Sequence, residues 1–380
     1  MKVIVLAPFP PRSDGRHGGA RALASLHRRL AARHRLVLLS LRADDEPPVD
    51  PELAAACEEV VEVRRPLARA SPAALWTERQ RMLGALRRQP GWVLGTDVAA
   101  LHAALRDAVE RHRPDVVHAE FAVMAQYAGD VAGPPVVVTD HSVAADGLDD
   151  AAMRRFRRKT YRRVSAVVCF TKNEVTELRS VIGEDATIHV IPLGVEVPPH
   201  ALGDSGTESS LLFVGSFVHP PNVDALRRIV DRVLPAVRDA VPAARLVVVG
   251  AAPPTELVDR AGVTAVGEVE SVTPYLTGAS VVLGPVWSGG GMRVKVLEAL
   301  AAGKAVASTP LGIEGLGVQP GEQAVVAEDE DELAREIVSL LHDPERRRRL
   351  GAAGRELMIG RFSWDRIAPQ YDAIYEQAAR

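Results

Sequence analysis

Two cations follow a run of glycines in the segment PVWSGGGMRVKVLEALAAGKAVAST, residues 285–309. The cations are Arg293 and Lys295, and they stand at the start of a helix-forming stretch that we expect to begin near Met292. The start of a helix presents unpaired backbone N–H groups and about half a positive charge. Glycines beside it leave the backbone open to close approach by a ligand. The three consecutive glycines are Gly289, Gly290 and Gly291.

The charge placement in this loop can be interpreted in two ways. A cation at the amino terminus of a helix is unfavourable by about 0.3–1 kcal/mol, and a bound dianion such as a pyrophosphate would reverse the sign of that interaction. The alternative is that both side chains extend into water, where the penalty is small. Charge placement alone supports the two interpretations equally, and the glycine run favours an anion site.

Short apolar runs alternate with amphipathic helices along both halves of the chain. In the first half, KVIVLAP and RLVLLSL have the pattern of buried strands on either side of the helix GGARALASLHRRLAARH. Further apolar runs, PDVVHAEF, PPVVVTDHS and AVVCFT, follow them. The alternation stops at PPHALGDSGTESS, which lacks periodicity, and restarts with LLFVGSF. Short apolar strands between helices indicate parallel sheets that are covered on both faces.

These patterns predict an α/β protein with two Rossmann-like parallel-sheet domains that face each other across a cleft. We expect the first domain over residues 1–197, a linker over 198–210 and the second domain over 211–362. Residues 363–380 form a final helix that could return to pack on the first domain. In open α/β sheets, ligands bind at the carboxyl ends of the strands, so the loops at those ends are where a site is expected.

The passage GPVWSGGGMRVKVLEALAAGKAVASTPLGIEGL resembles the nucleotide-sugar motif of glycosyltransferases with the GT-B fold, those of family 4 (group 1) in particular. It is similar to a subgroup with a GGGxRxKVLE motif. Three other segments resemble the family in the expected order: VIPLGVEV, LLFVGSFVHPPNVDALRRIV and RFSW. The resemblance implies a transferase of glycan or glycoconjugate biosynthesis in a bacterium. It implies a first domain on the acceptor side and a second that binds a nucleoside-diphosphate sugar.

The chain departs from the family pattern at two places. The family has two glutamates separated by seven residues; the second is Glu298, and the first would fall at Gly290. Many members carry an arginine and a lysine shortly after the strand that ends in VG, here Gly215, whereas this loop reads GSFVHPPN. We expect Arg293 and Lys295 to replace that cationic pair.

The resemblance implies which groups would hold the donor. The leaving nucleoside diphosphate needs its developing charge stabilised by cations, N–H dipoles or a metal. Arg293, Lys295 and the backbone of Gly290, Gly291 and Met292 predict a site without a metal or other cofactor. Glu298 would accept two hydrogen bonds from ribose hydroxyls, or else it pairs with Lys295 on the helix surface. The resemblance also implies retaining transfer, in which the leaving phosphate can take the acceptor's proton.

In the first domain, Gly18 and Gly19 join a strand to a helix, where the backbone could approach the donor phosphate. His118 and His141 stand at the ends of two strands and are the candidate catalytic residues, although a strand-end histidine is commonly structural. Relatives often have a histidine at the position of Glu120.

Composition limits the partners. The formal net charge of −3 excludes a general nucleic-acid binder, and no signal peptide or membrane-spanning run is present. We therefore expect a cytoplasmic protein that acts on a small-molecule, glycan or lipid-linked acceptor. The helix MRRFRRKTYRRVS carries seven cations, either as a solvated face or as a peripheral membrane contact. Alternatives are a non-catalytic nucleotide-sugar-binding protein or partner subunit, a two-domain ligand-binding protein, and an epimerase or phosphorylase.

Overall fold

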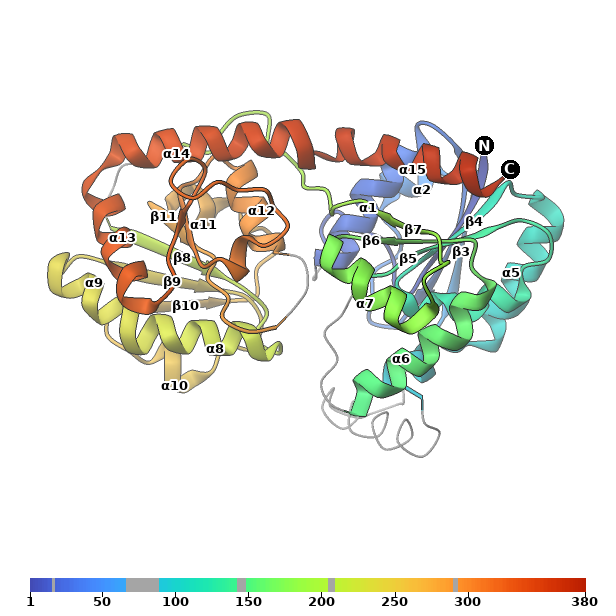
Figure 1. Ribbon diagram of the computed structural model, residues 1–380, viewed down its shortest axis with the longest axis horizontal. Helices are drawn as coiled ribbons and strands as arrows, with labels where there is room; N and C mark the ends of the chain where they lie inside the picture. The colour runs from blue at the N-terminus through green and yellow to red at the C-terminus, as the bar shows by residue number, and fades with distance from the viewer. Residues whose placement is uncertain (16–17, 66–88, 142–147, 204–208, 290–292) are drawn as a thin grey trace. The chain divides into compact units, whose positions relative to one another are not determined.

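A computed structural model describes residues 1–15, 18–65, 89–141, 148–203, 209–289 and 293–380. The chain forms two compact units (Figure 1). Unit 1 contains Met1–Leu193 together with Ile367–Arg380, and unit 2 contains Gly194–Arg366. Each unit is a parallel sheet covered by helices, so the predicted α/β fold with two Rossmann-like sheets is confirmed.

The sheet of unit 1 has seven parallel strands in the order β3-β2-β1-β4-β5-β6-β7. From β1 the chain first adds β2 and β3 on one side, and then adds β4 to β7 on the other side. The strands β1 and β4 are therefore neighbours at the point where the strand order reverses, which is where ligands bind in such sheets. The strands are β1 (Lys2–Ala7), β2 (Arg35–Arg42), β3 (Glu59–Arg64), β4 (Val116–Glu120), β5 (Val136–Thr139), β6 (Ala166–Cys169) and β7 (Ile188–Val190).

Helices cover both faces of this sheet (Figure 1). The predicted first helix is confirmed as α1, which begins at Gly18 and buries its leucines against the strands. The helical segments of unit 1 are α1 (Gly18–Ala31), α2 (Pro51–Ala56), α4 (Gly91–Thr96), α5 (Ala99–His112), η1 (Ala122–Asp130), α6 (Leu148–Thr160), η2 (Tyr161–Arg163) and α7 (Lys172–Ile182).

Unit 2 repeats the arrangement with six parallel strands in the order β10-β9-β8-β11-β12-β13. Its strands are short and apolar, and a side chain on the central strand β8, Phe213, is fully buried. The strands are β8 (Ser210–Val214), β9 (Arg245–Val249), β10 (Val263–Gly267), β11 (Val281–Leu283), β12 (Val306–Ser308) and β13 (Val325–Val326).

The helices of unit 2 follow the predicted pattern. The long helix expected after β8 is present, but its turns widen at Ile229–Val233. Pro235 follows directly and removes a backbone donor, which accounts for the widening. The helical segments are α8 (Pro220–Arg228), α9 (Leu234–Ala240), α10 (Thr255–Val258), α11 (Thr273–Gly278), α12 (Val294–Ala301), η4 (Leu311–Ile313), α13 (Glu330–His342) and α14 (Pro344–Leu357).

The last helix, α15 (Trp364–Ala378), belongs to unit 1 from Ile367 onward. Asp372 accepts hydrogen bonds from Arg33 and from His34, the latter at 2.9 Å. Tyr375 is fully buried, and its hydroxyl lies 2.7 Å from Nδ1 of His118 on β4. The helix therefore contributes to the polar core of unit 1. None of the helices in the described ranges is both long enough and apolar enough to span a bilayer.

Candidate active site

The two predicted cations of unit 2 are brought together at the start of α12. Arg293 is the residue directly before the helix, and its side chain is 8% exposed. Its guanidinium donates to the carbonyl oxygen of Leu311 at 3.0 Å and to that of Gly289 at 3.2 Å. These bonds fix the guanidinium between the glycine-rich loop and the PLGIEG segment that follows β12. Arg293 therefore connects the beginning and the end of the segment that resembles the family motif.

Lys295 lies in the first turn of α12 and extends toward β8. Its Nζ donates to Oδ1 of Asn222 at 2.7 Å and lies 4.1 Å from the centroid of the Phe213 ring. Asn222 in turn donates from its amide nitrogen to the carbonyl oxygen of Ser216 at 2.9 Å. We call Arg293, Lys295 and Asn222 the cation cluster. Within the described part of the chain, the ammonium of Lys295 thus contacts an amide and an aromatic ring, both of them neutral.

Glycines allow the turn after β8 to approach its neighbours. A Cβ at Gly250 would stand 1.9 Å from the carbonyl oxygen of Gly215, a contact that no side chain could make. A Cβ at Gly215 would approach the Asn222 side chain at 3.0 Å. Gly289 has a φ of 89° and lies against Pro221 at the start of α8. The turn after β8 and the loop before α12 therefore meet within unit 2.

Burial makes both cations unfavourable in the absence of a counter-charge. It lowers the pKa of Lys295 to about 7, with a further contribution from the neighbouring Arg293. Burial also lowers the pKa of Arg293, which the charge of Glu314 opposes, and an arginine remains charged at any physiological pH. Two cations close together at a helix start have the charge and the donors that could bind an anion.

The other predicted donor-site residues of unit 2 have mixed outcomes. Glu298 lies one turn after Lys295 on α12 and is half-buried. Lys295 donates to Asn222, and its alternative pairing with Glu298 stays a prediction. Gly290, Gly291 and Met292 lie outside the described residues. Gly303 follows the end of α12 with a φ of 76°, as expected of a glycine that terminates a helix.

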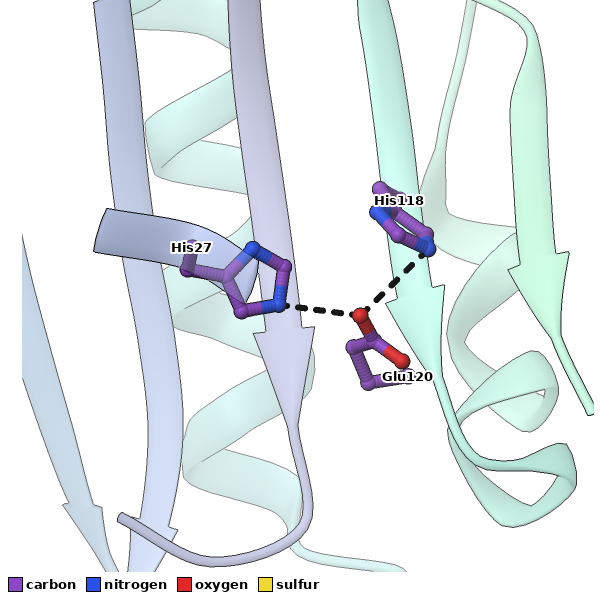
Figure 2. A group of neighbouring side chains, drawn as sticks. All are labelled: His27, His118 and Glu120. Carbon is purple, nitrogen blue, oxygen red and sulfur yellow. Dashed lines mark ion pairs between the residues drawn. The ribbon is translucent and has the colours of Figure 1, made fainter. Parts of the chain in front are cut away.

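In unit 1, a buried carboxylate stands at the end of β4. Figure 2 shows Glu120 with the rings of His27 from α1 and His118 from β4. Oε1 of Glu120 lies 2.9 Å from Nε2 of His27 and 3.6 Å from Nε2 of His118. Its other oxygen, Oε2, lies 2.8 Å from Nε2 of His141, which follows β5. We call Glu120 and these three histidines the Glu120 cluster.

Burial and neighbouring groups act in opposite directions on the pKa of Glu120. Burial alone would raise it, but the interactions with His118, His141 and His27 outweigh burial and hold this pKa well below the ordinary value. Burial lowers the pKa of His118 to about 4. The ring of His118 is held by hydroxyl groups, with Thr139 Oγ1 2.8 Å from Nε2 and Tyr375 Oη 2.7 Å from Nδ1.

The two predicted catalytic histidines therefore differ in their surroundings. His118 is completely buried, so its contacts are to the protein interior. The side chain of His141 is 12% exposed. Its ring stacks on Phe121 with centroids 3.9 Å apart and an interplanar angle of 14°. The edge of Phe170 packs against it at 4.9 Å and 80°. His141 is thus both fixed in position and open to solvent.

The donor atoms of the Glu120 cluster are of types that can bind a metal ion. Ligand atoms of His27, His118 and Glu120 lie within 4.8 Å of one another, and two imidazoles with a carboxylate suit zinc. Nε2 of His118 is already within hydrogen-bond distance of Thr139. To bind an ion, His118 would have to exchange that partner.

A second buried carboxylate stands at the end of the neighbouring strand β5. Asp140 is fully buried and forms two contacts with Arg157 of α6, to Nε at 2.8 Å and to Nη2 at 2.9 Å. The hydroxyl of Tyr161 donates to it at 2.7 Å. Arg157 is one of the seven cations of the basic helix, and the expectation of a wholly solvated face is wrong for it. The exposed cations of this segment are Arg155, Arg158, Lys159, Arg162 and Arg163.

Sequence reasoning missed several partners of these groups. Asn222 appears in the sequence only as part of GSFVHPPN, and nothing in its spacing indicates that it accepts a hydrogen bond from Lys295. His27 belongs to the apolar face of α1, where a polar residue among leucines is the signal that could have marked it. Gly18 and Gly19 form the first two residues of α1, as the strand–glycine–helix pattern predicts.

Comparisons with known proteins bear on both units. A family model described as Glycosyltransferase Family 4 matches residues 16–197, and one described as Glycosyl transferases group 1 matches residues 208–343. A GDP-mannose-dependent monoacylated alpha-(1-6)-phosphatidylinositol monomannoside mannosyltransferase of Corynebacterium glutamicum is 26% identical over 289 residues, which cover 69% of this chain and 75% of that protein.

Solved structures with the same fold cover nearly the whole chain. Sucrose-phosphate synthase of Thermosynechococcus elongatus has a TM-score of 0.74 at 19% identity and covers 99% of each chain. Anabaena HepE in complex with UDP has a TM-score of 0.69 at 15% identity, over 99% of this chain and 100% of that one. The matches to both halves and the two parallel sheets of the GT-B fold show that the chain is a glycosyltransferase of family 4, group 1.

Proposed function

We propose that the chain transfers a sugar from a nucleoside-diphosphate donor to a hydroxyl group of an acceptor, with retention of configuration and without a metal at the diphosphate. The observation that carries this proposal is the cation cluster. Arg293 is buried directly before helix α12, and Lys295 lies in its first turn against two neutral groups, Asn222 and Phe213. A diphosphate would place negative charge beside both cations.

Each element of the cluster has a separate role in this proposal. Arg293, which can donate two parallel hydrogen bonds, binds phosphate oxygens of the leaving group. Lys295 adds a point charge, and the backbone of Gly215 and of the loop before α12 allows the phosphates to approach. Glu298 accepts hydrogen bonds from the ribose hydroxyls one turn further along α12. Gly18 and Gly19 stay as predicted donor contacts from unit 1.

The proposal assigns different roles to the two candidate histidines. His141 is partly exposed at the end of β5, where ligands of parallel sheets bind, and it is the histidine that would contact substrate. His118 is buried behind it and would act by supporting Glu120 and Thr139. We therefore propose His141 as a catalytic residue and His118 as a positioning residue.

Nucleotide binding and donor turnover test the function together. A thermal-shift panel of UDP, GDP, dTDP and ADP identifies the base, and the matching nucleotide sugars are then incubated with the protein. We expect one nucleotide to raise Tm, and its sugar derivatives to be cleaved slowly to nucleoside diphosphate and free sugar. The anomeric configuration of the first product, followed by proton NMR, tests retention. Cleavage that stops in EDTA and returns with a divalent ion would contradict the metal-free site.

The acceptor class follows from two observations that support a lipid-linked or glycan acceptor. The corynebacterial relative is named for a phosphatidylinositol mannoside acceptor. The basic segment of unit 1 exposes Arg158 and Lys159, which could contact an anionic membrane surface. We expect the protein to sediment with phosphatidylglycerol vesicles but not with phosphatidylcholine vesicles. Replacing each of the two residues by glutamine should weaken that binding by about 1 kcal/mol.

A further inference from the structure

We propose that Glu120 is a positioning residue that, together with Phe121, holds the imidazole of His141 so that Nδ1 receives a hydrogen bond from a substrate hydroxyl. This inference rests on the proposed transferase function. It assigns a role to a carboxylate that is completely buried.

The first step of the argument concerns the proton on His141. Glu120 is surrounded by ring nitrogens, with Oε1 2.9 Å from Nε2 of His27 and Oε2 2.8 Å from Nε2 of His141. These neighbours keep it a carboxylate, and its pKa is held well below the ordinary value despite burial. An ionised carboxylate only accepts hydrogen bonds. Nε2 of His141, 2.8 Å from Oε2, must therefore carry a proton and donate it. In the neutral ring, this leaves the lone pair on Nδ1, which becomes the atom that can accept from a hydroxyl.

The second step concerns the backbone of Phe121, the residue after Glu120. Its φ of 68° and ψ of 141° lie in a region that residues other than glycine rarely adopt. Such strain costs about 1–3 kcal/mol and persists where the surrounding structure enforces it, often at functional sites. Here the Phe121 amide donates to the carbonyl oxygen of Thr139 at 2.9 Å, which secures the turn.

The strained turn places the Phe121 ring directly against His141. The rings stack at 3.9 Å, and Phe9 and Trp92 support the far side of Phe121 with centroids 5.1 and 5.5 Å away. His141 is therefore fixed by a hydrogen bond in the plane of its ring and by an aromatic ring against its face. Both constraints remain while the side chain keeps 12% exposure. A ring that is locked yet open to solvent is prepared to contact a substrate.

The third step concerns the charge of Glu120. A buried carboxylate needs a compensating charge or donors. Nε2 of His27 on α1 lies 2.9 Å from Oε1, although the two atoms lack the angular geometry of a hydrogen bond. Nε2 of His118 lies 3.6 Å from the same oxygen, and hydroxyls keep the His118 ring in place. His27 and His118 thus stabilise Glu120, and Glu120 orients His141.

Nitrogen NMR of the wild-type protein, labelled with 15N-histidine, tests the arrangement without any substitution in the site. His141→Gln identifies the resonances of His141 by their loss. We expect the neutral ring of His141 to be protonated at Nε2, with Nδ1 as the unprotonated nitrogen. A proton on Nδ1 with a lone pair on Nε2 would overturn the proposal. Stoichiometric zinc that copurifies and is lost in His27→Gln would overturn it also, because the cluster would then be a metal site.

Kinetics of two variants separate positioning from a structural role. His141→Gln should lower kcat by about 100-fold and Glu120→Gln by about tenfold or more, with nucleotide affinity within about twofold of wild type. Asp372→Asn is the matched control, because Asp372 also accepts from a histidine Nε2, that of His34 at 2.9 Å. It should leave kcat unchanged. If Glu120→Gln retains full kcat and an unchanged His141 tautomer, the proposal is wrong.

The same assays show whether the hydroxyl belongs to the donor or to the acceptor. They also test the transferase function separately from the role of Glu120. Loss of donor cleavage in the absence of acceptor indicates a hydroxyl of the donor sugar, and loss of transfer alone indicates the acceptor's hydroxyl. Failure of the wild-type protein to bind any nucleoside diphosphate would refute the transferase proposal itself. Normal nucleotide binding together with normal turnover in Glu120→Gln would refute only the role of Glu120.

Discussion

Both units bury charge at the carboxyl ends of their strands, but they neutralise it differently. In unit 1, Asp140 is met by the guanidinium of Arg157 and the hydroxyl of Tyr161, and Glu120 is met by histidines. In unit 2, the ammonium of Lys295 is met by an amide and an aromatic ring. The carboxylates of unit 1 thus lie against ionisable or hydroxyl groups of the protein, whereas the ammonium of Lys295 in unit 2 lies against neutral groups.

This difference separates two uses of buried charge. A charge with an internal partner contributes to the structure, and its removal leaves the partner uncompensated. A buried cation among neutral groups is held at a cost to stability, and its removal should relieve that cost while weakening the binding of an anion. The two units should therefore respond in opposite directions when their charges are removed.

The largest effect is expected for Asp140 in unit 1. Asp140→Asn leaves the buried guanidinium of Arg157 without its counter-charge and should lower the free energy of unfolding by about 3–5 kcal/mol. Denaturant unfolding measures this loss. The control is Asp372→Asn, whose partner Arg33 is 45% exposed, and which should cost about 1 kcal/mol or less. If both variants lose the same free energy of unfolding, burial does not determine how much these ion pairs stabilise the protein.

The next effect concerns binding in unit 2. Arg293→Ala and Lys295→Met should each weaken nucleoside diphosphate binding by about 1–3 kcal/mol, the usual value of a charged hydrogen bond. Lys295→Met should also raise the free energy of unfolding, because it replaces a cation that burial destabilises with an apolar chain of similar length.

Lys304→Met is the control, since Lys304 is a buried lysine that bonds to the carbonyl oxygen of Gly203. This variant should lose stability and keep its nucleotide affinity.

A third prediction follows from the pKa of Lys295, which burial lowers from 10.5 to about 7. Above pH 7 the free protein loses the charge that the diphosphate needs. Nucleotide affinity should then fall by up to about tenfold for each pH unit, and binding at pH 8 should take up a proton. Calorimetry in buffers of different ionisation enthalpy measures the uptake. Lys295→Arg stays charged and should show neither effect; a persistent pH dependence in that variant would assign the titration to another group.

The same pKa gives stability a pH dependence of definite sign. Between about 7 and 10.5 the unfolded chain binds more protons at Lys295 than the folded chain does. The contribution of this residue to stability therefore rises with pH across that window. Unfolding curves of wild type and Lys295→Met should converge toward the upper end of it.

The smallest effect is expected at Glu298. Glu298→Ala should weaken binding of a nucleoside diphosphate by about 1 kcal/mol through lost hydrogen bonds to the ribose. It should leave the affinity for inorganic pyrophosphate unchanged, because pyrophosphate has no ribose. Titration of both ligands gives the comparison. An equal loss for the two ligands would place Glu298 at the phosphates instead.

Much of the fold could be predicted because its signals are local. Runs such as KVIVLAP and LLFVGSF are continuous apolar strands, and the helices between them have amphipathic spacing. The strand β3 was missed because glutamates and an arginine alternate with its valines, which suits a half-buried edge strand but weakens the apolar pattern. The wide helical turns before Pro235 could not be predicted from the sequence either.

The site was only partly predictable because its partners come from distant segments. The cations of unit 2 were evident from the loop, but Asn222 and Phe213 reach Lys295 only once β8 and α12 are packed together. Arg157 appeared as one of seven similar cations, and its burial depends on Asp140 at the end of the adjacent strand. The partners of Glu120 lie on α1 and after β5, and no spacing in the sequence connects them.

The central claim is that the cation cluster of unit 2 binds a diphosphate. Calorimetric titration of inorganic pyrophosphate into wild type, Arg293→Ala and Lys295→Met tests it most directly, because pyrophosphate requires neither the base nor the sugar to be known. We predict that wild type binds and that each variant loses about 1–3 kcal/mol of affinity. Equal affinity in all three proteins would contradict the assignment of Arg293 and Lys295 to the donor phosphates.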